Sequence, residues 1–243
     1  MTTSARTMLL AAIAAAALTG TAAAEPSGPA AGKVTFLAGE ATRAAAGRTE
    51  ALAVGSAVRE GDVVETRRRT RLEIALADGS LFRLGPGSRA TLETAAFGSP
   101  GDRKVSARLA LGAVWANVAR AVGGESRFEV RTANAVAGVR GTTFRVDAAR
   151  DASVVVKVYG GAVAVSAGPV PRPAQTPASP ERRQVEGPAE VSREQWERIV
   201  TSMMQVRVSA DGVPAEPEAF ALADAGKDEW EAWNRQRDAT ARP

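Results

Sequence analysis

The 243-residue chain contains no cysteine and no histidine. Without cysteine it can form no disulfide, no thiolate metal site and no thiol nucleophile. Without histidine it lacks the commonest metal ligand and the usual general base. These absences exclude Ser/His/Asp hydrolases, Cys/His transpeptidases and histidine-ligated zinc enzymes. Carboxylate chemistry, serine/lysine chemistry or no chemistry remains, and we predict neither a metal nor a cofactor.

The chain also lacks long apolar runs, apart from one near its N-terminus. Arg6 precedes the run MLLAAIAAAALTG, and the small residues Ala22, Ala23 and Ala24 follow it. This order is typical of a signal peptide, so we predict that residues 1–24 are cleaved and that the protein is periplasmic or secreted. The alternative is an uncleaved anchor, but a spanning helix needs about 20 strongly apolar residues. We therefore expect no stable membrane insertion after cleavage.

Charge of either sign is not strongly in excess. The net charge is +4, and removing Arg6 with the signal peptide leaves +3, so we expect no nucleic-acid partner. The densest basic run consists of Arg67, Arg68, Arg69 and Arg71, with no interleaved aromatic residue for stacking on bases. We interpret this run as a solvated strand edge that prevents aggregation, and a site for an anionic partner is the alternative.

Short alternating runs separated by Gly and Asp fill residues 33–168, without helical periodicity. The first run places Val34, Phe36 and Ala38 on one face. Later, Leu76 and Phe82 flank a turn, and we expect a three-residue turn that sets them opposite each other. The adjacent Gly160 and Gly161 indicate another tight turn. Regular short strands of this kind predict an all-β sandwich, barrel or β-solenoid.

The segment VAGVRGTTFRV, residues 136–146, is the most distinctive part of this pattern. Gly138 and Gly141 can adopt backbone angles that other residues avoid. After them, Thr142, Phe144 and Val146 share one face of a half-buried strand. The segment therefore predicts a turn that enters a strand, which is a structural signal and not a catalytic one.

Six segments in order carry a resemblance to a known family. They are GKVTFLAGEA, LAVGSAVREGDVVET, LEIALADGSLFRLGPGS, LALGAVWANV, FEVRTANAVAGVRGTTFRV and VVVKVYGGAVAVS. Segment by segment, residues 32–168 resemble the FecR domain, a periplasmic β-rich module of bacteria. The resemblance implies a solenoid-like stack of short strands. The positions that match the family's motif are Gly61, Asp62, Thr66, Asp78, Gly79, Ser80, Gly138, Arg140, Gly141 and Thr142.

These motif residues favour turn chemistry over catalysis. Asp62, Asp78 and Thr142 each lie beside a glycine, where Asp and Thr side chains commonly bond to turn backbone. Trp115, in a strand that starts at glycine, is either a ligand platform or packing, and packing is the commoner role. A carboxylate enzyme acting on envelope polysaccharide is the alternative function, but it needs two acids close together. Asp62 and Glu65 are three apart and face opposite sides of a strand.

Beyond Gly168 the composition changes to a proline-rich linker, which we place at residues 169–190. Residues 191–243 then predict a helical tail. Ser192 and Gln195 form a capping box ahead of Trp196, Ile199, Val200 and Met203, and a second helix would carry Trp230 and Trp233. Trp196, Trp230 and Trp233 either pack on the β domain or bind a partner.

The resemblance implies a non-catalytic function. In the family's best-known members the FecR domain relays the state of an outer-membrane receptor to a cytoplasmic domain that controls a sigma factor. The few residues before the apolar run here cannot form such a domain. We therefore expect an extracytoplasmic binding module in signalling or envelope regulation, with a protein or a cell-envelope polymer as its partner.

Overall fold

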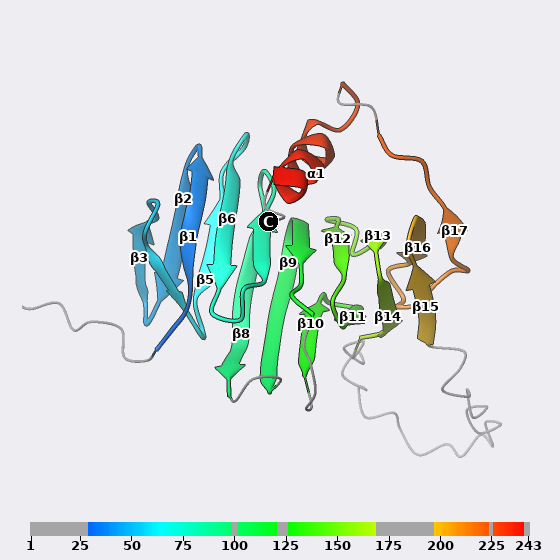
Figure 1. Ribbon diagram of the computed structural model, residues 1–243, viewed down its shortest axis with the longest axis horizontal. Helices are drawn as coiled ribbons and strands as arrows, with labels where there is room; N and C mark the ends of the chain where they lie inside the picture. The colour runs from blue at the N-terminus through cyan, green and yellow to red at the C-terminus, as the bar shows by residue number, and fades with distance from the viewer. Residues whose placement is uncertain (1–28, 99–101, 121–125, 169–196, 224–225, 241–243) are drawn as a thin grey trace, which may run out of the picture.

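The computed structural model describes residues 29–98, 102–120, 126–168, 197–223 and 226–240. These residues form two face-to-face β-sheets and one α-helix. Strands succeed one another across the molecule in chain order, from β1–β3 at one end to β14–β17 at the other, and α1 returns to the middle (Figure 1). The predicted all-β fold with a short C-terminal helix is confirmed. No helix in the described part of the chain is long and apolar enough to cross a membrane.

The strands divide between two sheets that share β9. Sheet A has the order β4-β1-β6-β7-β9-β12-β13-β16-β17, and sheet B has the order β3-β2-β5-β8-β9-β10-β11-β14-β15. The bounds in sheet A are β1 Ala30–Ala38, β4 Ala57–Arg59, β6 Arg71–Leu76, β7 Leu81–Leu84, β9 Arg103–Asn117, β12 Thr143–Ala148, β13 Val154–Gly160, β16 Met204–Val208 and β17 Glu218–Ala219. Those in sheet B are β2 Ala41–Ala45, β3 Arg48–Ala51, β5 Val63–Thr66, β8 Arg89–Phe97, β10 Arg127–Arg131, β11 Ala135–Val139, β14 Ala162–Ala167 and β15 Glu197–Thr201.

Strand β9 crosses from one sheet to the other. Its first half pairs with β8 and β10 in sheet B, and its second half pairs with β7 and β12 in sheet A. The crossing occurs at Gly112, whose φ is +91°. Ser88 lies against this glycine, and its hydroxyl bonds to both the N–H and the C=O of Ala113. The backbone bend at Gly112 therefore joins the two sheets.

The core lies between the sheets and is built from alternating residues. In β12, Phe144 and Val146 are buried, whereas Arg145 and Asp147 face outward. Thr142 is buried on the same side as Phe144, as the two-residue period predicts. One contiguous apolar cluster runs through both sheets. The alternation thus sends the apolar side chains inward and leaves charged side chains on the two outer faces.

Two local expectations need correction. The turn at Asp78 has three residues, but it pairs Ile74 with Phe82, so the predicted pairing of Leu76 with Phe82 is wrong by two residues. The tight turn predicted at Gly160 and Gly161 is confirmed, and it joins strands of different sheets, because β13 lies in sheet A and β14 in sheet B. A bulge in β1 between Val34 and Phe36 moves Phe36 off the inner face. The two-residue period of a strand sequence does not reveal where bulges and corners of this kind occur.

The first predicted tail helix is wrong over residues 197–208, which form β15 and β16. Strand β15 pairs with β14, and β16 pairs with β13, so the tail extends both sheets. Val200, Val206 and Val208 are fully buried in the core. The edges of β13 and β14 offer unpaired backbone groups, and pairing them outweighs the local helical pattern. Residues 1–24 and 169–190, together with Ser192, Gln195 and Trp196, lie outside the described residues.

The second predicted helix is confirmed as α1, Glu229–Thr240. Asp228 precedes it and accepts a hydrogen bond at Oδ1 from the N–H of Glu231, at 2.8 Å, which is an N-cap. Two acids lie in the first turn and Arg237 in the last, as the helix dipole favours. The helix packs on the outer face of sheet A.

Candidate functional site

The contact between α1 and sheet A contains four of the eight buried charged side chains in the described part of the chain, and we call it the latch. On the sheet side it consists of Glu73, Arg83, Trp115, Asn117, Arg145, Asp147, Lys157 and Tyr159. On the helix side it consists of Asp228, Trp230, Glu231, Trp233, Asn234, Arg237 and Asp238. The sheet residues come from β6, β7, β9, β12 and β13, which lie side by side. Sheet order, not chain order, therefore brings them together.

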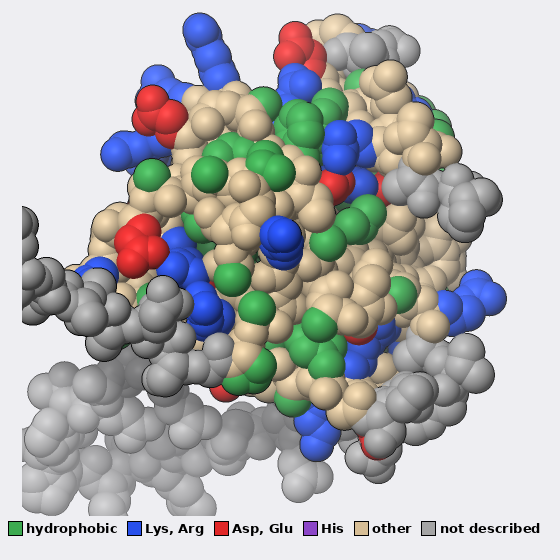
Figure 2. Space-filling view, turned by 60° about the vertical axis from the view of Figure 1, so that its left-hand side comes forward, with side chains coloured by type: hydrophobic (Ala, Val, Ile, Leu, Met, Phe, Trp, Pro, Cys, Tyr) green, Lys and Arg blue, Asp and Glu red, His purple; other side chains and the backbone are tan. Residues whose placement is uncertain are grey.

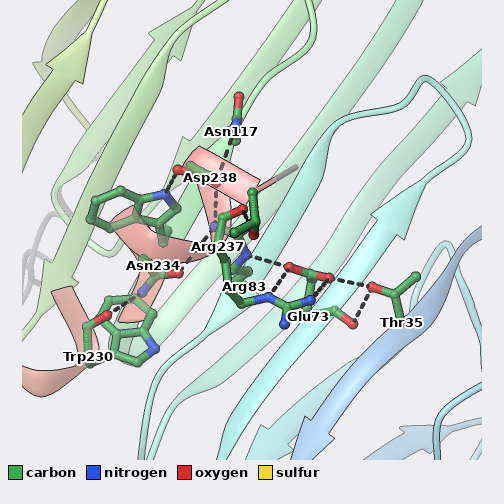
Figure 3. A network of polar contacts seen from close by, with 10 residues as sticks. Thr35, Glu73, Arg83, Asn117, Trp230, Asn234, Arg237 and Asp238 are labelled. Atoms are coloured by element: carbon green, nitrogen blue, oxygen red, sulfur yellow. Dashed lines mark hydrogen bonds and ion pairs between the residues drawn. The ribbon is translucent and has the colours of Figure 1, made fainter. Parts of the chain in front are cut away.

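Arg83 is the centre of the first half of the latch (Figure 3). Its guanidinium is fully buried and donates from Nε to Glu73 at 2.7 Å and from Nη1 to Asp238 at 2.7 Å. Arg237 of the helix donates twice to the same Glu73, at 2.8 and 2.9 Å, and Thr35 donates to it at 2.8 Å. Glu73 therefore holds one arginine from the sheet and one from the helix.

Asp238 has a second set of donors on the sheet. The indole N–H of Trp115 donates to its Oδ2 at 2.9 Å, and the amide of Asn117 donates to Oδ1 at 3.2 Å. Trp115 is 1% exposed, so the packing role expected for it holds here. One carboxylate near the helix C-terminus thus receives hydrogen bonds from three different sheet side chains.

The second half of the latch lies at the N-terminal end of α1. Arg145 bonds to Asp147 of its own strand and, through Nη1, to Asp228 at 2.5 Å. Tyr159 donates its hydroxyl proton to Glu231 at 2.9 Å, and Lys157 lies 3.9 Å from the same carboxylate. Both ends of the helix are therefore held by charge.

Aromatic rings fill the space between these ion pairs. Trp230 meets Trp115 edge-on with centroids 6.4 Å apart, and Arg145 lies 5.0 Å from its ring. Trp233 contacts Phe36, with centroids 5.3 Å apart. Trp230 is buried against sheet A and Trp233 is half-buried, so both pack on the β domain in this structure. Neither ring is a free partner-binding surface while α1 is docked.

The latch shifts the pKa values of its acids in opposite directions. Burial alone would raise the pKa of Glu73, but hydrogen bonds from Arg237, Arg83 and Thr35 outweigh it and lower the pKa from 4.5 to about 2. Burial raises the pKa of Asp147 despite Arg145 beside it. Burial also opposes ionisation of Asp228, but the Glu231 N–H and Arg145 hold its pKa below the ordinary range. Glu73 and Asp228 are therefore anchored as carboxylates.

The lowered pKa of Glu73 predicts an acid limit for stability. Its ionised form stabilises the fold fully above the unfolded pKa of 4.5, and this contribution is lost as pH falls toward about 2. Glu73→Gln should lower the free energy of unfolding near neutral pH and flatten its fall in that acid window. Urea unfolding across the window, with Glu65→Gln at an exposed ion pair as the control, measures the effect. An unchanged acid slope in Glu73→Gln would contradict the assignment.

Most of the motif residues lie in turns or at strand ends, and none of them is a latch residue. Asp62 accepts from the Arg59 N–H at 2.7 Å, and Thr66 donates to the Gly85 C=O at 2.6 Å. Asp78 accepts from the Ser80 N–H at 3.0 Å, and Thr142 bonds to the Ala162 C=O at 3.0 Å. The motif acids and hydroxyls thus close turns and corners, and the structure does not bring them into one cluster.

The two motif glycines differ in what they require. Gly141 has a φ of +58°, and a Cβ on it would lie 3.1–3.3 Å from Arg120. Gly138 lies within β11, and a Cβ there would meet only the Ala164 C=O, at 3.9 Å. The expectation that Gly138 needs unusual backbone angles is therefore wrong, because it occupies ordinary strand geometry.

This difference predicts unequal effects of substitution. Gly141→Val should destabilise the protein by about 1–3 kcal/mol, because a β-branched residue is strained at positive φ. Gly138→Ala is the matched control and should change stability by less than about 1 kcal/mol. Thermal unfolding measures both. Equal midpoints for wild type and Gly141→Val would mean that this turn adopts ordinary β geometry.

Arg67, Arg68 and Arg69 occupy the loop between β5 and β6. Arg71 begins β6, which pairs with β1 on one side and β7 on the other, so the expected position at a strand edge is wrong. Arg67, Arg68 and Arg69 are exposed, and no acid among the described residues pairs with them. Arg71 differs, because it contacts Glu229 at 3.3 Å and Trp233. Figure 2 brings this end of the molecule forward and shows Lys and Arg side chains projecting from it.

Carboxylates do come together in the latch, which sequence reasoning missed. Asp147 and Asp228 share Arg145, and Glu73 and Asp238 share Arg83. A positively charged arginine lies between the two members of each pair and donates hydrogen bonds to their carboxylate oxygens. Glycoside hydrolysis, in contrast, needs one acid that is free to donate a proton. Within the described residues no group of three acids could hold a metal ion.

Comparison with known proteins assigns a family to the central part of the chain. Residues 62–164 match the FecR protein family, so this part is a FecR domain. Two crystal structures of a proposed anti-sigma factor from Parabacteroides distasonis ATCC 8503, at 2.50 and 1.65 Å resolution, are similar at 20% identity, with TM-scores of 0.45 and 0.44. The similarity covers 65% of this chain and 59% of theirs, so the chain spans about three fifths of their length. No curated protein matches the chain.

Proposed function

Because this chain contains a FecR domain, we propose that it is a non-catalytic regulatory protein that acts by binding another protein in the cell envelope. The resemblance of the domain to signalling modules supports a regulatory role. The predicted signal peptide at residues 1–24 supports a periplasmic or secreted location. The proposal assigns no reaction to the protein.

The single observation that carries this proposal is the latch. The outer face of sheet A holds an α-helix by matched charges and aromatic contacts, with hydrogen-bond partners from five strands. Complementary charge of this kind provides specificity for one partner sequence more than it provides affinity. The latch therefore supports recognition of a polypeptide by sheet A, whereas the motif residues serve the turns.

Site-specific crosslinking in intact cells tests the proposal. A photoreactive residue replaces Arg207, exposed on the outer face of sheet A in β16, or Lys104, exposed on the outer face of sheet B in β9. We expect the Arg207 position to capture one envelope protein and the Lys104 position to capture none. Retention of both variants on the sacculus, with no protein captured, would favour a polymer-binding role instead.

A further inference from the structure

The buried side of α1 has the wrong chemistry for a permanent part of the core. Its buried residues are Trp230, Glu231, Asn234 and Asp238, and only the first is apolar. A helix that belongs permanently to a domain normally buries an apolar stripe. A buried polar and aromatic stripe is typical of surfaces between molecules that associate and separate.

The side chains on the sheet side of the latch are also suited to contact with water when the helix is absent. Glu73, Arg83, Arg145 and Lys157 all project from the outer face of sheet A toward the helix. Buried ion pairs add little net stability, because each charge gives up its hydration to form the pair. When the helix leaves, these groups regain water. The face therefore tolerates both a covered and an open state, which a purely apolar face does not.

The connection to α1 is long and contains little regular structure. Between the end of β16 at Val208 and the start of the helix, the described chain contains the two-residue strand β17 and one isolated pairing, Val208 with Pro214. Its other contacts with the sheets are single ones, such as Phe220 with Tyr159, whose ring centroids are 5.2 Å apart. A tether of this length keeps a released helix near its site at about millimolar effective concentration. Release is therefore compatible with rebinding.

From these three observations we propose that α1 is a displaceable occupant of sheet A, and that a helix of the partner protein takes its place. The partner helix should repeat the chemistry of α1: an aromatic residue followed directly by an acid, and a second acid seven residues later. Trp230, Glu231 and Asp238 have this spacing, and seven residues are about two helical turns, so both acids lie on one face. This inference rests on the proposed function for the identity of the partner, but not for the release of α1.

Hydrogen exchange on the intact protein tests release without any partner. We expect the amides of α1 to exchange at least about tenfold faster than those of β9 and β12, because local opening does not require global unfolding. Raising the salt from about 50 to about 500 mM should speed exchange in α1 several-fold further and leave β12 nearly unchanged. Equal protection of α1 and β12 at both salt concentrations would overturn the proposal.

Binding of a peptide that copies α1 tests whether the outer face of sheet A accepts a second helix. The probe is a fluorescent peptide of residues 226–240, and the full chain carries Glu231→Gln and Asp238→Asn to weaken only the tethered helix. We expect at least about tenfold tighter binding to this chain than to wild type, because a tethered competitor reduces apparent affinity. A peptide with the same two substitutions should bind more weakly than the native peptide. Equal affinity of the two chains for the native peptide would contradict displacement.

A change on the sheet completes the test. Arg83→Met should abolish peptide binding, and Tyr159→Phe, which removes only the hydroxyl bonded to Glu231, should weaken it several-fold while the fold is retained. Unaltered binding by Tyr159→Phe, with an unchanged circular dichroism spectrum, would show that the peptide binds elsewhere. Failure of crosslinking in cells with successful peptide exchange would reject the proposed function and leave the displacement of α1 intact.

Discussion

Replacing Gly112 with alanine should strongly destabilise this protein. A Cβ on Gly112 would lie 2.4 Å from Ser88 Oγ and 2.6 Å from its Cα, and the residue has a φ of +91°. The backbone cost of positive φ and the overpacking cost each amount to about 1–3 kcal/mol. We expect a loss of about 2–6 kcal/mol in the free energy of unfolding, measured by urea denaturation.

Gly79→Ala is the matched control for this prediction. Gly79 has a similar φ of +81°, but a Cβ there meets nothing within 4 Å. It should therefore show only the backbone cost, about 1–2 kcal/mol. If Gly112→Ala and Gly79→Ala lose the same stability, β9 can shift away from Ser88, and the crossing between the sheets is less closely packed than the structure indicates.

A chain that ends at Gly168 should lose cooperative folding, whereas a chain that ends at Ala223 should keep it. The shorter chain lacks β15 and β16, and with them the fully buried Val200, Val206 and Val208. Burial of each valine contributes roughly 1.5–3 kcal/mol. Removal of β15 and β16 also leaves the long edges of β13 and β14 unpaired, which promotes aggregation. We therefore expect that residues 32–168 do not fold alone.

Truncation at Ala223 removes α1 and leaves all the strands in place. Its loss breaks the latch, but the charges on sheet A regain water, so we expect a small fall in the melting temperature and an unchanged β-type circular dichroism signal. Cooperative unfolding of both truncated chains would show that residues 32–168 fold without β15 and β16. Loss of folding in both would show that α1 belongs to the core and would also contradict its displacement.

The sequence by itself determined the fold class and the local chemistry of the turns. The two-residue period from β1 to β14 is a local property, because alternate side chains must face opposite sides of a strand. Side chains such as Asp62 and Asp78 bond to backbone within three residues, so their roles are also readable from their neighbours. The helix at residues 229–240 was predictable for the same reason, since its tryptophans recur at helical spacing and most of its polar residues surround them.

Only the tertiary structure decided where the tail goes and what the outer face of sheet A contains. Residues 197–208 carry a helical pattern, yet they become strands because the open edges of β13 and β14 supply hydrogen-bond partners 31 to 54 residues away. Likewise, Glu73, Arg83 and Asp238 look like ordinary solvated charges in the sequence. They form a buried site because sheet order aligns β6, β7 and β9 under α1. Pairings between distant segments depend on which edges remain unfilled when the chain collapses, and no local pattern of residues records that.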